Sequence, residues 1–412
     1  MDWLLAALAV FNVVSMFQAF KPRTFAADSA PWFTFVFALP ATELSWIWLP
    51  LQALIALLLV AGGALHSTLG TIALLVLFVS WAGLALSIYQ SLRSEAPVED
   101  ALLRALGADY RAAIPPEIGA RLRREVRFDH WRHPFRMKRP DVEVIRDLSY
   151  GPGGIKQKFD IYRPVSIPEE GCPVLLQIHG GAWMIGDKER QALPLMHHMA
   201  ANGWICVAIN YRLSPSVSFP THLLDCKSAL CWIRTRGREY GMNPDFVAVT
   251  GGSAGGHLTA LMGLTANRAD LQTDHPDVDT TVQACVPFYG VYDFTNRDRL
   301  QPGGDRMKEF LEKYVMHRSP QEDPGLWDLA SPISQVREDA PPFMIVHGER
   351  DSLAPVSMAR LFSQRLRAVS ANPVAYLELQ GAEHAFELVH SPRTEYTIDG
   401  VHRFLEWVRA RA

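Results

Sequence analysis

The run Val247–His257 holds a Gly-x-Ser-x-Gly sequence between two apolar stretches, and it constrains the fold more than any other part of the chain. β-branched residues open it, Ser253 lies at its centre, and the apolar run Leu258–Leu264 follows. This order predicts a strand, a tight turn and a helix, and the turn forces Ser253 into a strained conformation that only small neighbours allow. The hydroxyl is then expected at a helix N-terminus, where the helix dipole favours developing negative charge. One such turn is a weak signal, so its meaning depends on partners elsewhere in the chain.

The first ninety residues are far more apolar than the rest of the 412-residue chain. Three uncharged runs of about twenty residues, Trp3–Phe20, Leu44–Leu65 and Leu69–Tyr89, match the length of a bilayer crossing. The stretch Pro31–Pro40 is apolar but short, and we expect it in the membrane interface or as a re-entrant piece. The sequence therefore predicts a helical membrane region over residues 1–92 with about three transmembrane helices.

Basic residues around these runs indicate an orientation. The short loop between the second and third runs has no lysine or arginine. The basic residues follow the first run and the third run: Lys21, Arg23, Arg93, Arg104 and Arg111. With three spans, the positive-inside rule places the C-terminal part in the cytoplasm, and two or four spans would reverse this. The five cysteines agree, because their odd number and lack of Cys-x-x-Cys pairs are typical of buried free thiols in a reducing compartment. We expect a multi-pass integral membrane protein.

Residues 93–140 form a predicted basic juxtamembrane linker with short cap helices. Between Arg121 and Arg139 eight lysines and arginines stand against two acidic residues, with Trp131 and Phe135 interleaved. One interpretation is a patch that lies on anionic lipid head groups, and the other is a solvated linker whose charges face water. Nucleic acid is not expected as a partner, because no binding fold accompanies the patch and the net charge of the chain is only -3.

From residue 141 onward, short β-rich runs alternate with helical stretches, which is typical of a mostly parallel sheet covered by helices on both faces. Ligands bind such sheets beyond the carboxyl ends of the strands. Four motifs fall at predicted strand ends: His179–Trp183, the Ser253 turn, Gly348–Asp351 and Gly381–Phe386. We expect these motifs to meet at one edge of the sheet.

The order Ser, Asp, His of these motifs resembles the α/β-hydrolase superfamily. From about residue 141 the chain looks like the hormone-sensitive-lipase and acetyl-esterase group and the related carboxylesterase, feruloyl-esterase-like and arylformamidase groups. Asn210–Pro215 is similar to a stretch of that group. Two positions depart from its pattern: Ala182 replaces the third glycine of the best-known motif, and Gly252 stands where Asp is usual. The resemblance implies an α/β-hydrolase fold over residues 141–412.

The resemblance also implies roles for single residues. Ser253 is the expected nucleophile, His384 the base that activates it, and Asp351 the acid that orients the imidazole. Glu349, two residues before Asp351, is the alternative acid. The expected oxyanion hole consists of three backbone amides, those of Gly180, Gly181 and Ala254.

Other residues near these motifs receive weaker assignments. Trp183 is a candidate for substrate binding in the acyl pocket, with a plain core position as the alternative. Structural roles are expected for four further residues: His179, Tyr211, Asp225 and His257. The interval 291–334 interrupts the alternation of strands and helices, and we expect it to form a cap insertion over the site.

These features predict a membrane-anchored serine carboxylester hydrolase, an esterase or lipase that works through an acyl-enzyme. Its location suggests small or amphiphilic esters as substrates and membrane lipids as partners, while protein partners stay open. An arylformamidase-like amide hydrolase is one alternative, because its motifs look much the same, and a non-catalytic ligand-binding relative is another. Metal-ligand spacing does not occur in the sequence, so no metal and no cofactor are expected.

Overall fold

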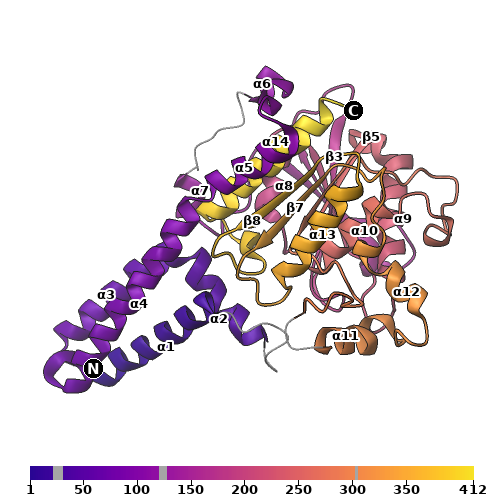
Figure 1. The fold of residues 1–412 in the computed structure, drawn as a ribbon. Helices are drawn as coiled ribbons and strands as arrows, with labels where there is room; N and C mark the ends of the chain where they lie inside the picture. Colours follow the sequence, from indigo (N-terminus) through magenta and orange to yellow (C-terminus); the bar gives the residue numbers. More distant parts are fainter. Residues whose placement is uncertain (22–30, 120–127, 302–304) are drawn as a thin grey trace.

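The computed structural model describes residues 1–21, 31–119, 128–301 and 305–412. Figure 1 shows a central sheet flanked by helices, from which the N-terminal helices project as an arm with the N-terminus at its tip. Residues 121–127 of the predicted basic patch lie outside the described residues.

The sheet has eight strands in the order β1-β2-β4-β3-β5-β6-β7-β8. β2 pairs antiparallel with both of its neighbours, whereas all pairs from β4 to β8 are parallel. This confirms the predicted mostly parallel sheet with flanking helices. The strands are β1 (Val142–Ser149), β2 (Lys158–Pro164), β3 (Cys172–Ile178), β4 (Ile205–Ile209), β5 (Met242–Gly252), β6 (Ala284–Phe288), β7 (Phe343–Gly348) and β8 (Val374–Leu379).

The strand β3 illustrates how the sequence forms the core. All of its residues are buried, as a strand covered on both faces requires. Leu176 packs in the core on the side of α9, α10 and α13, whereas Leu175 packs on the side of α8 and α14, because successive side chains alternate between the faces. These helices are α8 (Leu193–Ala201), α9 (Thr221–Arg236), α10 (Ala254–Leu264), α13 (Val356–Val369) and α14 (Pro392–Arg409). The five cysteines are buried and unpaired, as predicted.

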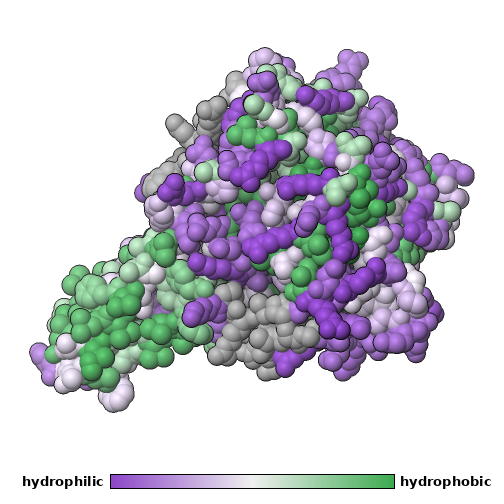
Figure 2. Space-filling view, in the orientation of Figure 1, coloured by the Kyte–Doolittle hydropathy of each residue, from purple (hydrophilic) through white to green (hydrophobic). Residues whose placement is uncertain are grey.

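The N-terminal arm consists of the apolar helices α1 (Asp2–Phe20), α2 (Pro31–Glu43), α3 (Ser45–Ala61) and α4 (Thr68–Leu92). Among the described residues, two segments are long and apolar enough to cross a membrane, Asp2–Phe20 and Thr68–Leu106. A third exists if α2 and α3, which are bent by 89°, count as one span. Figure 2 shows hydrophobic residues gathered on the surface of this arm.

The bend between α2 and α3 coincides with a buried ion pair. Glu43, the last residue of α2, pairs with the Arg393 guanidinium of α14 and accepts a hydrogen bond from Ser391 Oγ at 2.8 Å. The sequence had suggested a span over Leu44–Leu65 and only a short piece over Pro31–Pro40, but α3 ends at Ala61 and the short piece is helical. A buried charge requires a partner, so the contact of Glu43 fixes the end of α2 on α14.

Short helices connect the arm with the sheet and fill the interval between β6 and β7. The first set comprises α5 (Glu95–Leu106), α6 (Pro116–Gly119) and α7 (Phe128–Arg132). The second comprises α11 (Arg306–Leu311), a π-helical turn over Glu312–Met316 and α12 (Pro324–Leu329). The division of the chain at residues 92 and 140, and a cap over 291–334, stay predictions.

Candidate active site

The Ser253 turn has the expected strand–turn–helix form. β5 ends at Gly252, Ser253 has φ 59° and ψ -120°, and α10 begins at Ala254. A Cβ atom on Gly255 would lie 2.0 Å from the Ile178 carbonyl oxygen, and one on Gly251 would lie 2.5 Å from the same oxygen. Both positions therefore have no room for a side chain, and the strained serine is held at the mouth of α10.

His384 and Asp351 come from the loops after β8 and β7, and they form a buried pair. His384 Nδ1 lies 2.8 Å from Asp351 Oδ2. Asp351 Oδ1 accepts hydrogen bonds from the amides of Leu353 at 2.8 Å and Ala354 at 2.7 Å, and His347 Nε2 lies 3.2 Å from Oδ2. Burial opposes ionisation, but the imidazoles of His384 and His347 hold the pKa of Asp351 below its usual range. An ionised Asp351 keeps the proton of His384 on Nδ1 and leaves Nε2 free to accept one.

Two acidic neighbours of this pair have other partners. Glu349, the alternative acid, is exposed and accepts from the Gly381 amide at 2.9 Å. Glu383 is buried, and its Oε1 accepts from the amides of Ser352 at 2.7 Å and His384 at 2.8 Å. Burial and the negative charge of Asp351 raise the pKa of Glu383 to about 7. Sequence reasoning missed Glu383, although its place beside His384 was a signal.

The expected oxyanion amides differ in their hydrogen bonding. The Gly180 amide donates to Gln191 Oε1 at 2.6 Å. Ala254 is the first residue of α10, so its amide has no acceptor within the helix. Gly181 has φ 120° and lies in a turn, where its carbonyl oxygen accepts hydrogen bonds from the amides of Met184 and Ile185. The Ala254 amide is therefore free of the helix ladder, whereas the Gly180 amide is already bonded to Gln191.

The candidate nucleophile, the candidate base and the glycine pair border one cavity of about 280 Å³. Ser253 and His384 both line it, and its walls are mostly apolar. The other lining residues include Gly180, Gly181, Trp183, Gln191, Tyr289, Val291, Met307, Phe310, Leu353 and Leu388. Met307 and Phe310 belong to the predicted cap interval, so part of that interval borders the cavity.

The cavity also has a wall that the sequence did not suggest. Phe35 of α2, more than 200 residues before Ser253, lines it, and the ring centroids of Phe35 and His384 lie 6.3 Å apart. Trp183 lines the cavity too, but its side chain is buried and its Nε1 donates to His257 Nδ1 at 3.2 Å. Trp183 thus combines the two expected positions, core and pocket wall.

The residues expected to be structural are all buried. The His179 ring stacks on Tyr211 with centroids 4.4 Å apart, and its Nδ1 lies 2.8 Å from the Gly180 carbonyl oxygen. Burial lowers the pKa of His179 to about 4, so the ring is neutral at pH 7. Asp225 pairs with Arg212 at 2.6 Å. The contacts of His179 with Tyr211 and Gly180 support the loop that bears the glycine pair.

Comparisons with known proteins give the relatives of this chain. The BD-FAE family model matches residues 159–366, about half of the sequence. Esterase LipQ of Mycobacterium tuberculosis is 41% identical over 325 residues, which make up 77% of this chain and 76% of that protein. The probable carboxylic ester hydrolase LipM of the same organism is 47% identical over 281 residues, 67% of this chain and 64% of LipM. Esterase B from Lactobacillus rhamnosis shares the fold, with a TM-score of 0.57 at 22% identity over 77% of this chain and 98% of that one.

Proposed function

The chain belongs to the BD-FAE family and is an α/β-hydrolase carboxylester hydrolase, and from this premise we propose that it acts through a Ser253–His384–Asp351 triad. One observation carries the proposal: the strained Ser253 and the Asp351-bound His384 line the same cavity. A hydroxyl, a base and an acid from three strand ends, in contact with one space, are what nucleophilic acyl transfer requires.

In the proposed reaction, Ser253 Oγ attacks the ester carbonyl carbon while His384 Nε2 takes the hydroxyl proton. Asp351 stabilises the imidazolium that forms. The negative charge on the carbonyl oxygen is bound by the amides of Gly181 and Ala254, and by the Gly180 amide once it exchanges Gln191 for the oxyanion. His384 then protonates the leaving alcohol, and water activated by the same imidazole hydrolyses the acyl-enzyme.

We propose an amphiphilic ester as the substrate, because the cavity is apolar and one of its walls belongs to the arm. Phe35 of α2 contacts the same space as Ser253, and α1, α3 and α4 expose large apolar side chains such as Trp3, Leu58 and Val79. If the arm lies in a bilayer, an acyl chain can pass from lipid along α2 into the cavity without crossing water. The orientation with a cytoplasmic catalytic part, and contact with membrane lipids, belong to this proposal.

An amide-hydrolysing alternative of the arylformamidase type receives no support from the relatives, which are named as esterases. A non-catalytic role would require a serine that is not activated, and the pairing of His384 with Asp351 argues against it.

The test uses the full chain in detergent and p-nitrophenyl esters of increasing acyl length. We expect hydrolysis by the native chain and a fall to background for Ser253→Ala. Full activity of Ser253→Ala would refute the triad. For the substrate class, we expect esters embedded in liposomes to be turned over faster than short soluble esters, and the reverse order would refute bilayer delivery while leaving the triad intact.

A further inference from the structure

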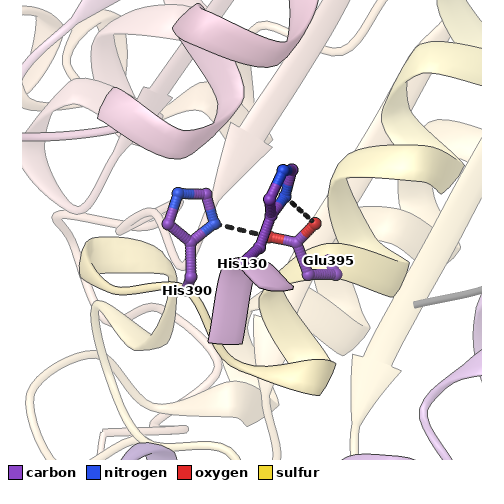
Figure 3. Close-up of side chains that lie close together, drawn as sticks. All are labelled: His130, His390 and Glu395. Carbon is purple, nitrogen blue, oxygen red and sulfur yellow. Dashed lines mark hydrogen bonds and ion pairs between the residues drawn. The ribbon is translucent and has the colours of Figure 1, made fainter. Parts of the chain in front are cut away.

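Two histidines and a glutamate meet away from the candidate active site, where the linker contacts the sheet domain. His130 is part of α7, His390 lies just before α14, and Glu395 is in the first turn of α14. His130 Nδ1 lies 2.9 Å from Glu395 Oε2, and His390 Nδ1 lies 2.5 Å from Glu395 Oε1. Figure 3 shows both rings directed at the same carboxylate.

We propose that His130, His390 and Glu395 bind a divalent transition-metal ion, with Zn²⁺ as the best match. One ligand atom from each residue lies within 4.8 Å of the other two. Zn²⁺ takes imidazole nitrogen and carboxylate oxygen at about 2.0–2.2 Å, so tetrahedral ligands lie roughly 3.3–3.6 Å apart. The two nitrogen–oxygen contacts, at 2.9 and 2.5 Å, are shorter than this, so they need to lengthen by roughly 0.4–1.1 Å to admit the ion.

The surroundings leave room for a fourth ligand. A cavity of about 510 Å³ is lined by all three side chains. A site with three protein ligands and a water molecule is a common zinc arrangement. Nδ1 faces the carboxylate in both rings, so both histidines present the nitrogen that would bind the ion.

Nearby charges are compatible with a cation. Glu395 is the one acidic side chain of the three, and each of its carboxylate oxygens faces an imidazole nitrogen. Arg139, which lines the same cavity, is paired with Asp141 at 2.8 Å. Arg136 and Lys138 are exposed, so water screens their charges.

The position of the site suggests what the ion does. The His390 amide donates to the Pro134 carbonyl oxygen at 3.0 Å, so the linker and the loop before α14 already touch. The same connection between β8 and α14 carries His384, six residues before His390. A bound ion would join α7 to this loop and hold the segment that carries the candidate base. His130 lies 265 positions before Glu395, which is why ligand spacing along the chain gave no sign of the site.

The test measures Zn²⁺ binding by the full chain in detergent, after a chelator has removed bound metal. Binding is measured by isothermal titration calorimetry and by the Zn²⁺-dependent shift of the thermal midpoint. We expect about one ion per chain, and roughly a hundredfold weaker binding in His130→Ala and in Glu395→Gln. His133→Ala removes an exposed histidine of the same segment and is the matched control, with unchanged affinity expected.

Circular dichroism shows whether each variant is folded. No Zn²⁺ binding by the native chain at 100-fold excess of ion would overturn the proposal and leave the cluster as a hydrogen-bonded contact. Equal affinity of the native chain, His130→Ala and Glu395→Gln would overturn it too, because the ion would then bind elsewhere. Neither result bears on the triad, which is tested through Ser253.

Discussion

Replacing Asp351 by Asn tests whether Asp351 holds His384 in the tautomer that can accept the proton of Ser253. Asn can keep the two hydrogen bonds from the amides of Leu353 and Ala354, which Asp351 Oδ1 accepts at 2.8 and 2.7 Å. The new amide nitrogen then faces His384 Nδ1 and His347 Nε2, where Oδ2 accepted before. His384 must turn to the other tautomer, with its proton on Nε2, and it can no longer accept the proton of Ser253.

The expected loss follows from that change of tautomer. An asparagine in this role lowers kcat by about 10⁴-fold, which corresponds to about 5.5 kcal/mol of transition-state stabilisation. The assay is steady-state hydrolysis of a p-nitrophenyl ester by the detergent-solubilised chain, with kcat and KM determined separately. KM should change little, because Asp351 does not line the cavity.

Glu349→Gln is the matched control. Its carbonyl oxygen can still accept from the Gly381 amide, which donates to Glu349 at 2.9 Å, and its side chain is exposed. We expect activity within about twofold of the native chain. A kcat for Asp351→Asn above a tenth of the native value, or an equal loss in Glu349→Gln, would show that the acid is not Asp351.

Three further changes test the surroundings of the site. Burial and Asp351 raise the pKa of Glu383 from 4.5 to about 7, so this group destabilises the fold as pH rises from 4.5 to 7. Over that range the unfolding free energy of Glu383→Gln should rise by about 3 kcal/mol relative to that of the native chain. Urea titrations that give parallel pH profiles for the two proteins would contradict this. Phe35→Ala should lower kcat/KM for long-chain esters by about tenfold and leave acetate esters nearly unchanged, whereas an equal loss for both would exclude a role in chain binding. Glu43→Gln leaves the buried Arg393 charge unpaired, so the free energy of unfolding should fall by about 3–5 kcal/mol and the thermal midpoint should fall with it. An unchanged midpoint would show that the pair does not hold α2 on α14.

The parts of the fold that local chemistry determines could be predicted from the sequence. The strand before Ser253 is β-branched, the glycines around it leave no alternative to a tight turn, and β3 and β4 are apolar because helices cover both faces. The motifs at the ends of β3, β5, β7 and β8 meet because carboxyl ends of parallel strands share one edge of the sheet.

The parts that depend on distant contacts could not be predicted. Phe35 lines the cavity on a helix whose last residue, Glu43, pairs with Arg393, 350 positions further along the chain. The same contact ends α2 where the hydropathy pattern suggested that a span begins. Gln191 has ordinary sequence surroundings, and its importance comes from the Gly180 amide that it meets in space.

The most direct test of Ser253 as the nucleophile is the chemical identity of the residue that a serine-reactive probe modifies. The full chain is treated with a fluorophosphonate probe and digested, and the labelled peptide is identified by mass spectrometry. We expect one adduct, on Ser253, and no labelling of Ser253→Ala. An adduct on another residue, or equal labelling of the variant, would contradict the claim that Ser253 is the nucleophile.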